Sequence, residues 1–181
     1  LLWLAGAAVP AVVALWVNFL VLTIAGERLE LSRSLPPSPG AKRIFKVILA
    51  VLVAGCFLNV AGSGIVIYGI GLLGLALWLL RQDIARRTVK ERGLTRFIAV
   101  CLLSGYVWLA LAGAILLGAG LAPGTAAYDA ALHALMLGFV FSMVFGHAPI
   151  IFPAVLRVAV LYHPLFHAPL LLLHASLVLR V

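Results

Sequence analysis

Long apolar runs with few charges are the feature that most constrains this chain. Hydrophobic residues make up 65% of its 181 residues and charged residues only 10%, whereas soluble domains carry about 25% charged residues. An apolar run of about 20 residues crosses the hydrocarbon core of a bilayer as an α-helix, which satisfies its own backbone polar groups. The sequence therefore predicts an all-α fold, a polytopic transmembrane helix bundle in contact with lipid.

Six membrane spans are expected in a single domain that covers residues 1–181. The run Pro-Pro-Ser-Pro-Gly at 36–40 cannot continue a helix, so we expect an aqueous loop from Glu27 to Arg43. The chain begins with Leu inside one apolar run and ends inside another, so we expect a fragment of a larger membrane protein. The expected spans are 1–26, 44–60, 64–80, 97–118, 128–152 and 167–181, with the second and third forming a tight hairpin.

Close helix packing is expected from small residues four positions apart. Ala110, Ala114 and Gly118 follow this spacing in the fourth expected span, and small residues allow two helix backbones to approach each other in a membrane. The sequence therefore predicts that another helix packs closely on this face.

The basic residues predict the orientation in the membrane. Eleven of the 13 Lys and Arg residues lie in the first and third loops between expected spans or, for Lys46, in the first turn of the span that follows, and such loops are cytoplasmic by the positive-inside rule. We therefore expect a bacterial cytoplasmic (inner) membrane protein with its N-terminus outside. The net charge of +8 does not indicate a nucleic-acid partner, because the basic residues flank apolar runs instead of forming a solvated basic face. The acidic residues in these loops, Glu27, Glu30, Asp83 and Glu91, are expected to be local charge partners.

All five histidines lie in the last third of the chain. His133 and His147 share one apolar segment, and an ionisable side chain inside a membrane span is a functional candidate. Their separation of 14 residues brings both side chains within about 40° of one helix face, with a difference in depth of roughly 21 Å. His163, His167 and His174 follow on the next segment, also at helical spacings.

Two groups of histidines follow if these two segments form an antiparallel hairpin. His133 and His174 then lie at a similar outer depth and are candidate axial ligands of a haem b, because bis-histidine ligation needs histidines on facing helices. His147, His163 and His167 lie near the opposite end and are candidate metal ligands, with copper as the candidate ion. Each histidine taken alone also fits a structural hydrogen bond between helices.

The histidine segment resembles a helix of known haem proteins. The order His133, Gly138-Phe139, Phe145-Gly146 and Pro153 is similar to that around the low-spin haem ligand in subunit I of heme-copper oxidases, especially cbb3-like members, and in NnrS-type multi-span haem proteins. The resemblance covers about one helix and implies that His133 takes the place of the haem ligand. The chain lacks the His-His pair and the His-x-x-x-Tyr helix that those oxidases use for copper and oxygen chemistry.

Three functions are compatible with the sequence. The first is haem or metal binding for electron transfer, respiration or nitrogen-oxide metabolism, with a redox partner or other membrane subunits. The second is a transporter or channel in which the histidines line a proton or solute path, and the third is a purely structural membrane subunit. No complete catalytic constellation is present, so whether the chain is an enzyme stays open.

The orientation is tested by labelling single cysteines introduced at Ser38 and Thr88 in intact cells. Both positions lie in the basic loops, so an impermeant thiol reagent added from the periplasmic side is expected to label neither, while both react after the membrane is opened. Efficient labelling of both positions in intact cells would reverse the predicted orientation.

Overall fold

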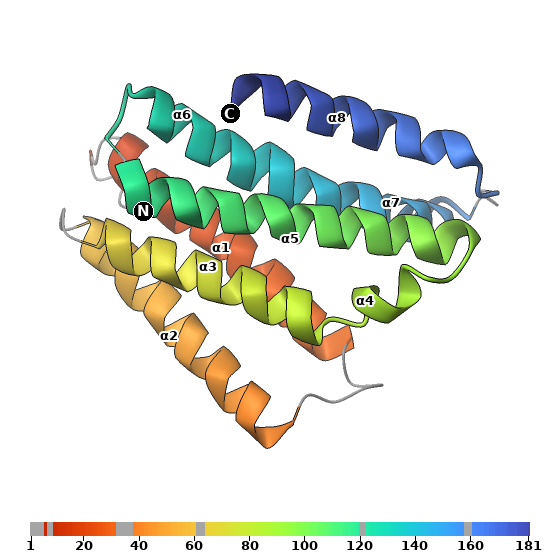
Figure 1. Cartoon of the computed structure of the whole chain (residues 1–181), viewed down its shortest axis with the longest axis horizontal. Helices are drawn as coiled ribbons and strands as arrows, with labels where there is room; N and C mark the ends of the chain where they lie inside the picture. Colours follow the sequence, from red (N-terminus) through yellow and green to blue (C-terminus); the bar gives the residue numbers. More distant parts are fainter. Residues whose placement is uncertain (1–5, 7–8, 32–37, 61–63, 120–121, 158–160) are drawn as a thin grey trace.

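The structure, a computed structural model, describes residues 6, 9–31, 38–60, 64–119, 122–157 and 161–181. Every regular element in these residues is helical, and no strand occurs among them, so the expected all-α bundle is confirmed. The helices run roughly lengthwise through the molecule, with α2 diverging from the others at one end (Figure 1). Four of the described helices are long and apolar enough to cross a membrane.

The helix bounds follow the apolar runs closely. The first three helices are α1 (Val9–Leu31), α2 (Pro39–Val60) and α3 (Ile65–Gln82), and a short α4 (Ala85–Thr88) leads into α5 (Gly93–Ala119). A continuous helix then consists of α6 (Ala126–His133), the π-helical segment η2 (Ala134–Val140) and α7 (Phe141–Leu156). The 3-10 turn η3 (Pro164–Phe166) precedes α8 (His167–Arg180).

The expected loop after the first span is shorter than predicted. Helix α1 continues through Leu31 and α2 begins at Pro39, so Glu27 and Arg28 are helical; residues 32–37 of the expected loop lie outside the described residues. The sequence prediction was wrong here because it treated charged residues as the end of the span. Arg28 is only 6% exposed, and it remains in the helix because the bundle supplies polar partners for it.

Glycine contacts hold the central helices close together. Helix α5 packs against α3 through Gly113 and Gly69, where a β-carbon added to Gly113 would lie 3.0 Å from the Gly69 carbonyl oxygen. The hairpin of α2 and α3 is equally tight, since a β-carbon on Gly55 would lie 2.5 Å from the Tyr68 backbone nitrogen. The predicted contact face was wrong, because Ala114 and Gly118 are exposed. Spacing alone identified small residues but not the face that another helix covers.

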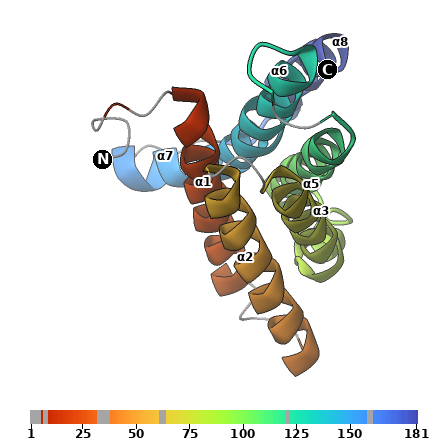
Figure 2. The same ribbon diagram turned by 90° about the vertical axis from the view of Figure 1, so that its left-hand side faces the viewer.

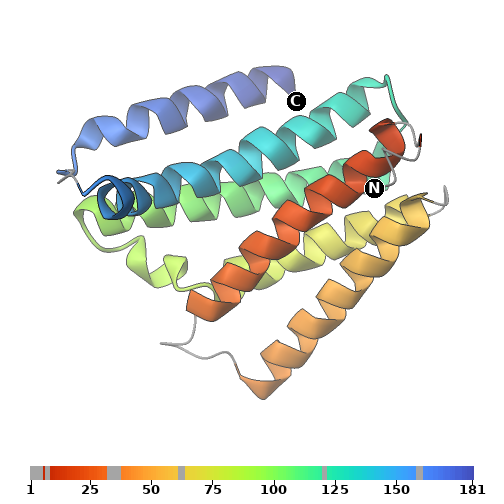
Figure 3. The ribbon, with the colours of Figure 1, turned by 180° about the vertical axis from the view of Figure 1, so that it is seen from behind.

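The last two helical segments form the expected antiparallel arrangement. Helix α8 lies along the α6–α7 helix in opposite views of the molecule (Figures 1 and 3), and Arg180 near its end contacts Asp129 near the start of α6. Helix α8 has 14 residues, about 21 Å at 1.5 Å per residue, which is shorter than the roughly 30 Å hydrocarbon core.

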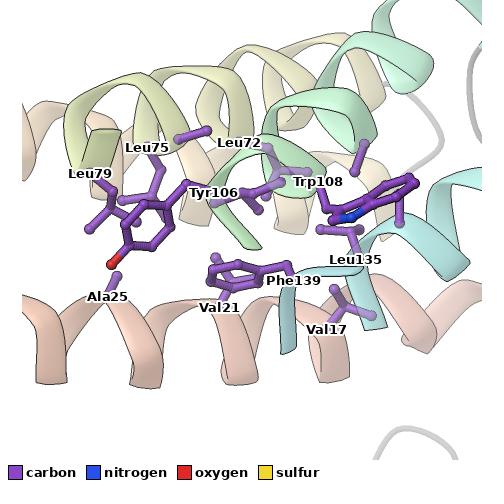
Figure 4. Packing of buried hydrophobic residues seen from close by; sticks show 14 of the residues in the cluster. Val17, Val21, Ala25, Leu72, Leu75, Leu79, Tyr106, Trp108, Leu135 and Phe139 are labelled. Carbon is purple, nitrogen blue, oxygen red and sulfur yellow. The ribbon is translucent and has the colours of Figure 1, made fainter. Parts of the chain in front are cut away.

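The core lies where α1, α3, α5 and the π-helical segment meet. Figure 2 shows α1 and α2 on one side of the bundle and α3 and α5 on the other. Phe139 and Tyr106 are fully buried between these helices, near Val21 of α1 (Figure 4). This core fixes the relative positions of α1, α5 and α7, which carry the polar side chains described below.

Candidate functional site

A buried arginine joins α1 to the histidine helix. The Arg28 guanidinium lies 2.9 Å from His147 Nε2, and His147 Nδ1 lies 2.6 Å from the Met143 carbonyl oxygen. Arginine only donates and a carbonyl only accepts, so His147 Nδ1 carries a proton and donates it to Met143, while Nε2 accepts from Arg28. His147 is therefore held as the neutral imidazole in one defined tautomer.

A buried aspartate lies in the same part of the bundle. Asp83 ends α3 and is 7% exposed. Its Oδ2 accepts a 2.8 Å hydrogen bond from the Tyr106 hydroxyl, and its Oδ1 accepts a 2.7 Å bond from the Ala85 backbone N–H. The Tyr106 hydroxyl also lies near the Arg28 guanidinium. The buried cation Arg28 and the buried anion Asp83 therefore both lie next to the Tyr106 hydroxyl. Each gains a polar partner, which a buried ion requires.

We call Arg28, Asp83, Tyr106 and His147 the inner polar cluster. Its members come from α1, the end of α3, α5 and α7, so four helices contribute to one hydrogen-bonded group. The Arg28–His147 and Tyr106–Asp83 contacts are short enough to be hydrogen bonds, and removing one partner of either pair would leave a buried polar group unsatisfied. The cluster therefore ties the rotation of each helix to that of the others.

His133 lies in a second polar group at the other end of the α6–α7 helix. Its Nδ1 is 2.7 Å from the Asp129 carbonyl oxygen and donates to it, since a carbonyl only accepts. In the neutral ring the Nε2 lone pair is then free to bind a ligand. The Asp129 carboxylate accepts two hydrogen bonds from Arg180, one from Nε at 3.1 Å and one from Nη2 at 3.2 Å. This pair joins the start of α6 to the end of α8.

His174 lies on α8, which runs antiparallel to the helix that carries His133. Asp129 and Arg180 join the start of α6 to the end of α8. The Trp108 indole, which bonds His174, packs on Gly138, five residues beyond His133. The two predicted haem ligands therefore lie on neighbouring segments, at levels that differ by less than about two helical turns.

The hydrogen bonds of His174 point to a specific tautomer. The Trp108 indole N–H donates to His174 Nδ1 at 2.9 Å, and the two rings stack with centroids 6.2 Å apart. A neutral His174 then carries its proton on Nε2, which is buried without a hydrogen-bond partner among the described residues. Nε2 is thus the atom open to a ligand, but it must lose its proton before it can bind a metal.

The three histidines of the predicted inner group, His147, His163 and His167, each contact different residues. His163 accepts from the Leu165 backbone N–H at 3.2 Å, while His167 Nδ1 contacts the Pro164 carbonyl and its ring meets Phe97 edge-on at 5.0 Å. His147 is held by Arg28. Within the described residues, no group of three or more His, Cys, Asp or Glu side chains is arranged to hold a metal ion.

A π-helical segment follows His133 directly. Residues Ala134–Val140 form it, and such segments are frequent at functional sites because they interrupt the regular helix. Gly138 lies in this segment, and a β-carbon there would come within 2.5 Å of the Trp108 side chain. Gly138 is therefore needed to seat Trp108, the residue that fixes the His174 tautomer.

Sequence reasoning missed four residues of these sites, namely Arg28, Asp83, Tyr106 and Trp108. Arg28 and Asp83 were assigned to loops because neighbouring residues are charged, and no spacing marks the two aromatic residues as polar partners. The available signal was position: Tyr106 and Trp108 lie in the middle of an apolar span, where a hydroxyl or indole N–H needs a partner.

These features define a helical membrane-type bundle with one polar cluster at each end of its histidine helix. The family model described as Domain of unknown function (DUF8744) matches residues 1–181, and the chain belongs to that family. No curated protein and no solved structure matches the chain.

Replacing one buried tyrosine by phenylalanine tests the inner polar cluster. Tyr106→Phe leaves Asp83 Oδ2 without its donor, so we expect the free energy of unfolding in detergent to fall by about 1–3 kcal/mol. Tyr68→Phe is the matched control, because Tyr68 is also buried (1% exposed) but its hydroxyl has no partner among the described residues. The control is expected to stay within about 0.5 kcal/mol of the wild type. Equal effects of the two changes would contradict the Asp83 contact.

Proposed function

We propose that this chain is a haem-binding integral membrane protein that serves electron transfer in respiratory or nitrogen-oxide-related metabolism. The observation that carries the proposal is the pair His133 and His174 on neighbouring antiparallel segments, His133 with a fixed ring orientation and His174 with an Nε2 that has no partner among the described residues. A fixed Nδ1–H···O=C bond of the kind His133 makes is typical of metal-binding histidines, because it orients the ring and raises the basicity of Nε2.

His174 is the proposed second axial ligand. Its Nε2 is buried and unpartnered in the described part of the chain, so binding would satisfy an otherwise orphaned atom. Ligation requires that the ring proton leave Nε2, and a ring with a proton on Nδ1 no longer accepts from Trp108. Haem binding and the Trp108 bond are therefore alternatives, and the indole must turn away when the ligand is bound.

The residues around the histidines give the site its chemistry. Haem supplies one-electron transfer when bound, and the protein sets its potential through the axial ligands, their hydrogen bonds and the burial of the site. Asp129 and Arg180 hold the ends of α6 and α8 together beside His133. They thereby keep the segments that carry the two histidines side by side.

The proposal places the protein in the bacterial cytoplasmic membrane, with its N-terminus outside. The warrant is the concentration of Lys and Arg in the first and third loops. His133 and His174 are then in the outer half of the bundle and the inner polar cluster is toward the cytoplasm. An electron partner would approach the haem site from the outer side.

A proton path is the second candidate function, and the inner polar cluster favours it. The ionisable side chains near this cluster form a series across four helices: Glu27, His147, Arg28, Tyr106 and Asp83. Chains of ionisable groups within a membrane bundle serve as proton relays. The two functions are separated by visible absorbance, because a proton path alone needs no coloured cofactor.

His133→Ala tests the haem proposal. Wild-type protein purified after haem-replete expression is expected to show a Soret band and reduced α-band, and the substitution is expected to abolish both because it removes an axial ligand. His163→Ala is the control, since His163 is exposed on the turn before α8, and it should keep the wild-type spectrum. His174→Ala should convert six-coordinate low-spin haem to a five-coordinate high-spin form. A colourless wild-type protein would overturn the proposal in favour of the proton path.

A further inference from the structure

A cavity lies between α1 and α7, away from the proposed haem site. Its volume is about 390 Å³, within the range of about 300–1,000 Å³ typical of small-molecule sites. Most of its wall is apolar, and Glu27 and His147 are its ionisable residues. The apolar part of the wall includes Leu20, Ile24, Val144, Ile151 and Phe152.

The charge facing this cavity is negative. Glu27 and Arg28 are neighbours on α1, so their side chains diverge by about 100°. Arg28 is buried and bound to His147, and it interacts with Tyr106, the partner of Asp83. Glu27 is exposed and lines the cavity. Because His147 is held neutral by its two hydrogen bonds, the Glu27 carboxylate is the charge that a ligand in the cavity meets.

A carboxylate beside an apolar wall suits a ligand that carries a positive charge and apolar groups. The exposed Glu27 carboxylate beside this apolar wall attracts a cation, because water screens two charges less next to apolar side chains than in bulk solvent. Phe152 adds an aromatic face, which attracts cations through the ring quadrupole. Leu20, Ile24 and Val144 contact apolar substituents but offer no hydrogen bonds. An anion would be repelled by Glu27, and Arg28 lies behind His147 without lining the cavity.

We propose that the cavity between α1 and α7 binds a lipophilic organic monocation, with Glu27 as its counter-ion and Phe152 against its charged or aromatic part. The site is independent of haem, since His133 and His147 are separated by roughly 21 Å along their helix at 1.5 Å per residue. A cation of this class enters from the lipid side, because the cavity is bordered by exposed apolar residues of α7, including Val144 and Ile151.

The test uses two probes of nearly identical shape and opposite charge. Radiolabelled tetraphenylphosphonium and tetraphenylborate are dialysed to equilibrium against the full chain in an uncharged maltoside detergent, with protein-free micelles as background. The expected result is saturable binding of about one phosphonium ion per chain and no saturable binding of the borate. Equal binding of both ions would show an apolar cavity without charge selection and would overturn the proposal, as would no saturable phosphonium binding.

Four variants assign the binding to this cavity. Glu27→Gln is expected to weaken phosphonium binding at least tenfold and Glu27→Asp to restore most of it, while Val144→Trp abolishes binding by filling the space. Val107→Trp is the matched control, because Val107 is 58% exposed on α5 and does not line the cavity. Unchanged binding in Glu27→Gln or Val144→Trp, with both variants retaining the wild-type helix content, would overturn the proposal. Loss of binding in the Val107→Trp control would overturn it equally.

Discussion

The inner polar cluster depends on one constraint, which is that a charge buried among apolar helices must be paired. Arg28 lies in the last turn of α1 and is 6% exposed among apolar helices, and an isolated buried ion costs several kcal/mol. Its partners come from other helices: His147 from α7 and, through Tyr106 of α5, Asp83 at the end of α3. The rotation of α1 about its axis is therefore set by where these partners lie. Hydrogen bonds are directional, so this group restricts that rotation more than apolar contacts alone do.

The π-helical segment links the two ends of the histidine helix. An uninterrupted α-helix would direct His133 and His147 to nearly the same face, but a π segment of i→i+5 bonds changes the phase between them. In the structure His147 meets Arg28 of α1, whereas His133 contacts Asp129 of its own helix, beside the end of α8. One helix thus supplies two polar sites with different neighbours. Gly138 allows this segment to pack directly on Trp108.

The sequence was sufficient for the elements but not for their polar contacts. Apolar runs and turn residues located the membrane-type helices, and the predicted antiparallel arrangement of the last two segments is present. Periodicity does not give the rotation of one helix against another, so it could not show that Trp108 reaches His174 or that Gly113 meets Gly69. Arg28 was misplaced in a loop because its burial depends on partners distant in the sequence. Asp83 does lie just beyond the end of α3, as predicted, but its burial was missed for the same reason. The same limit applies to the inner histidines, whose contacts are set by turns and rings near α8.

The pairing of Arg28 with His147 is the central claim, and a double-mutant cycle tests it most directly. The free energy of unfolding in mild detergent would be measured for the wild type, Arg28→Met, His147→Leu and the double variant. Each single change leaves one buried polar group without its partner, whereas the double change removes both. The account predicts that the double variant loses less stability than the two single variants combined, by about 1–3 kcal/mol. Additive effects to within about 0.5 kcal/mol would contradict a direct contact between the two side chains.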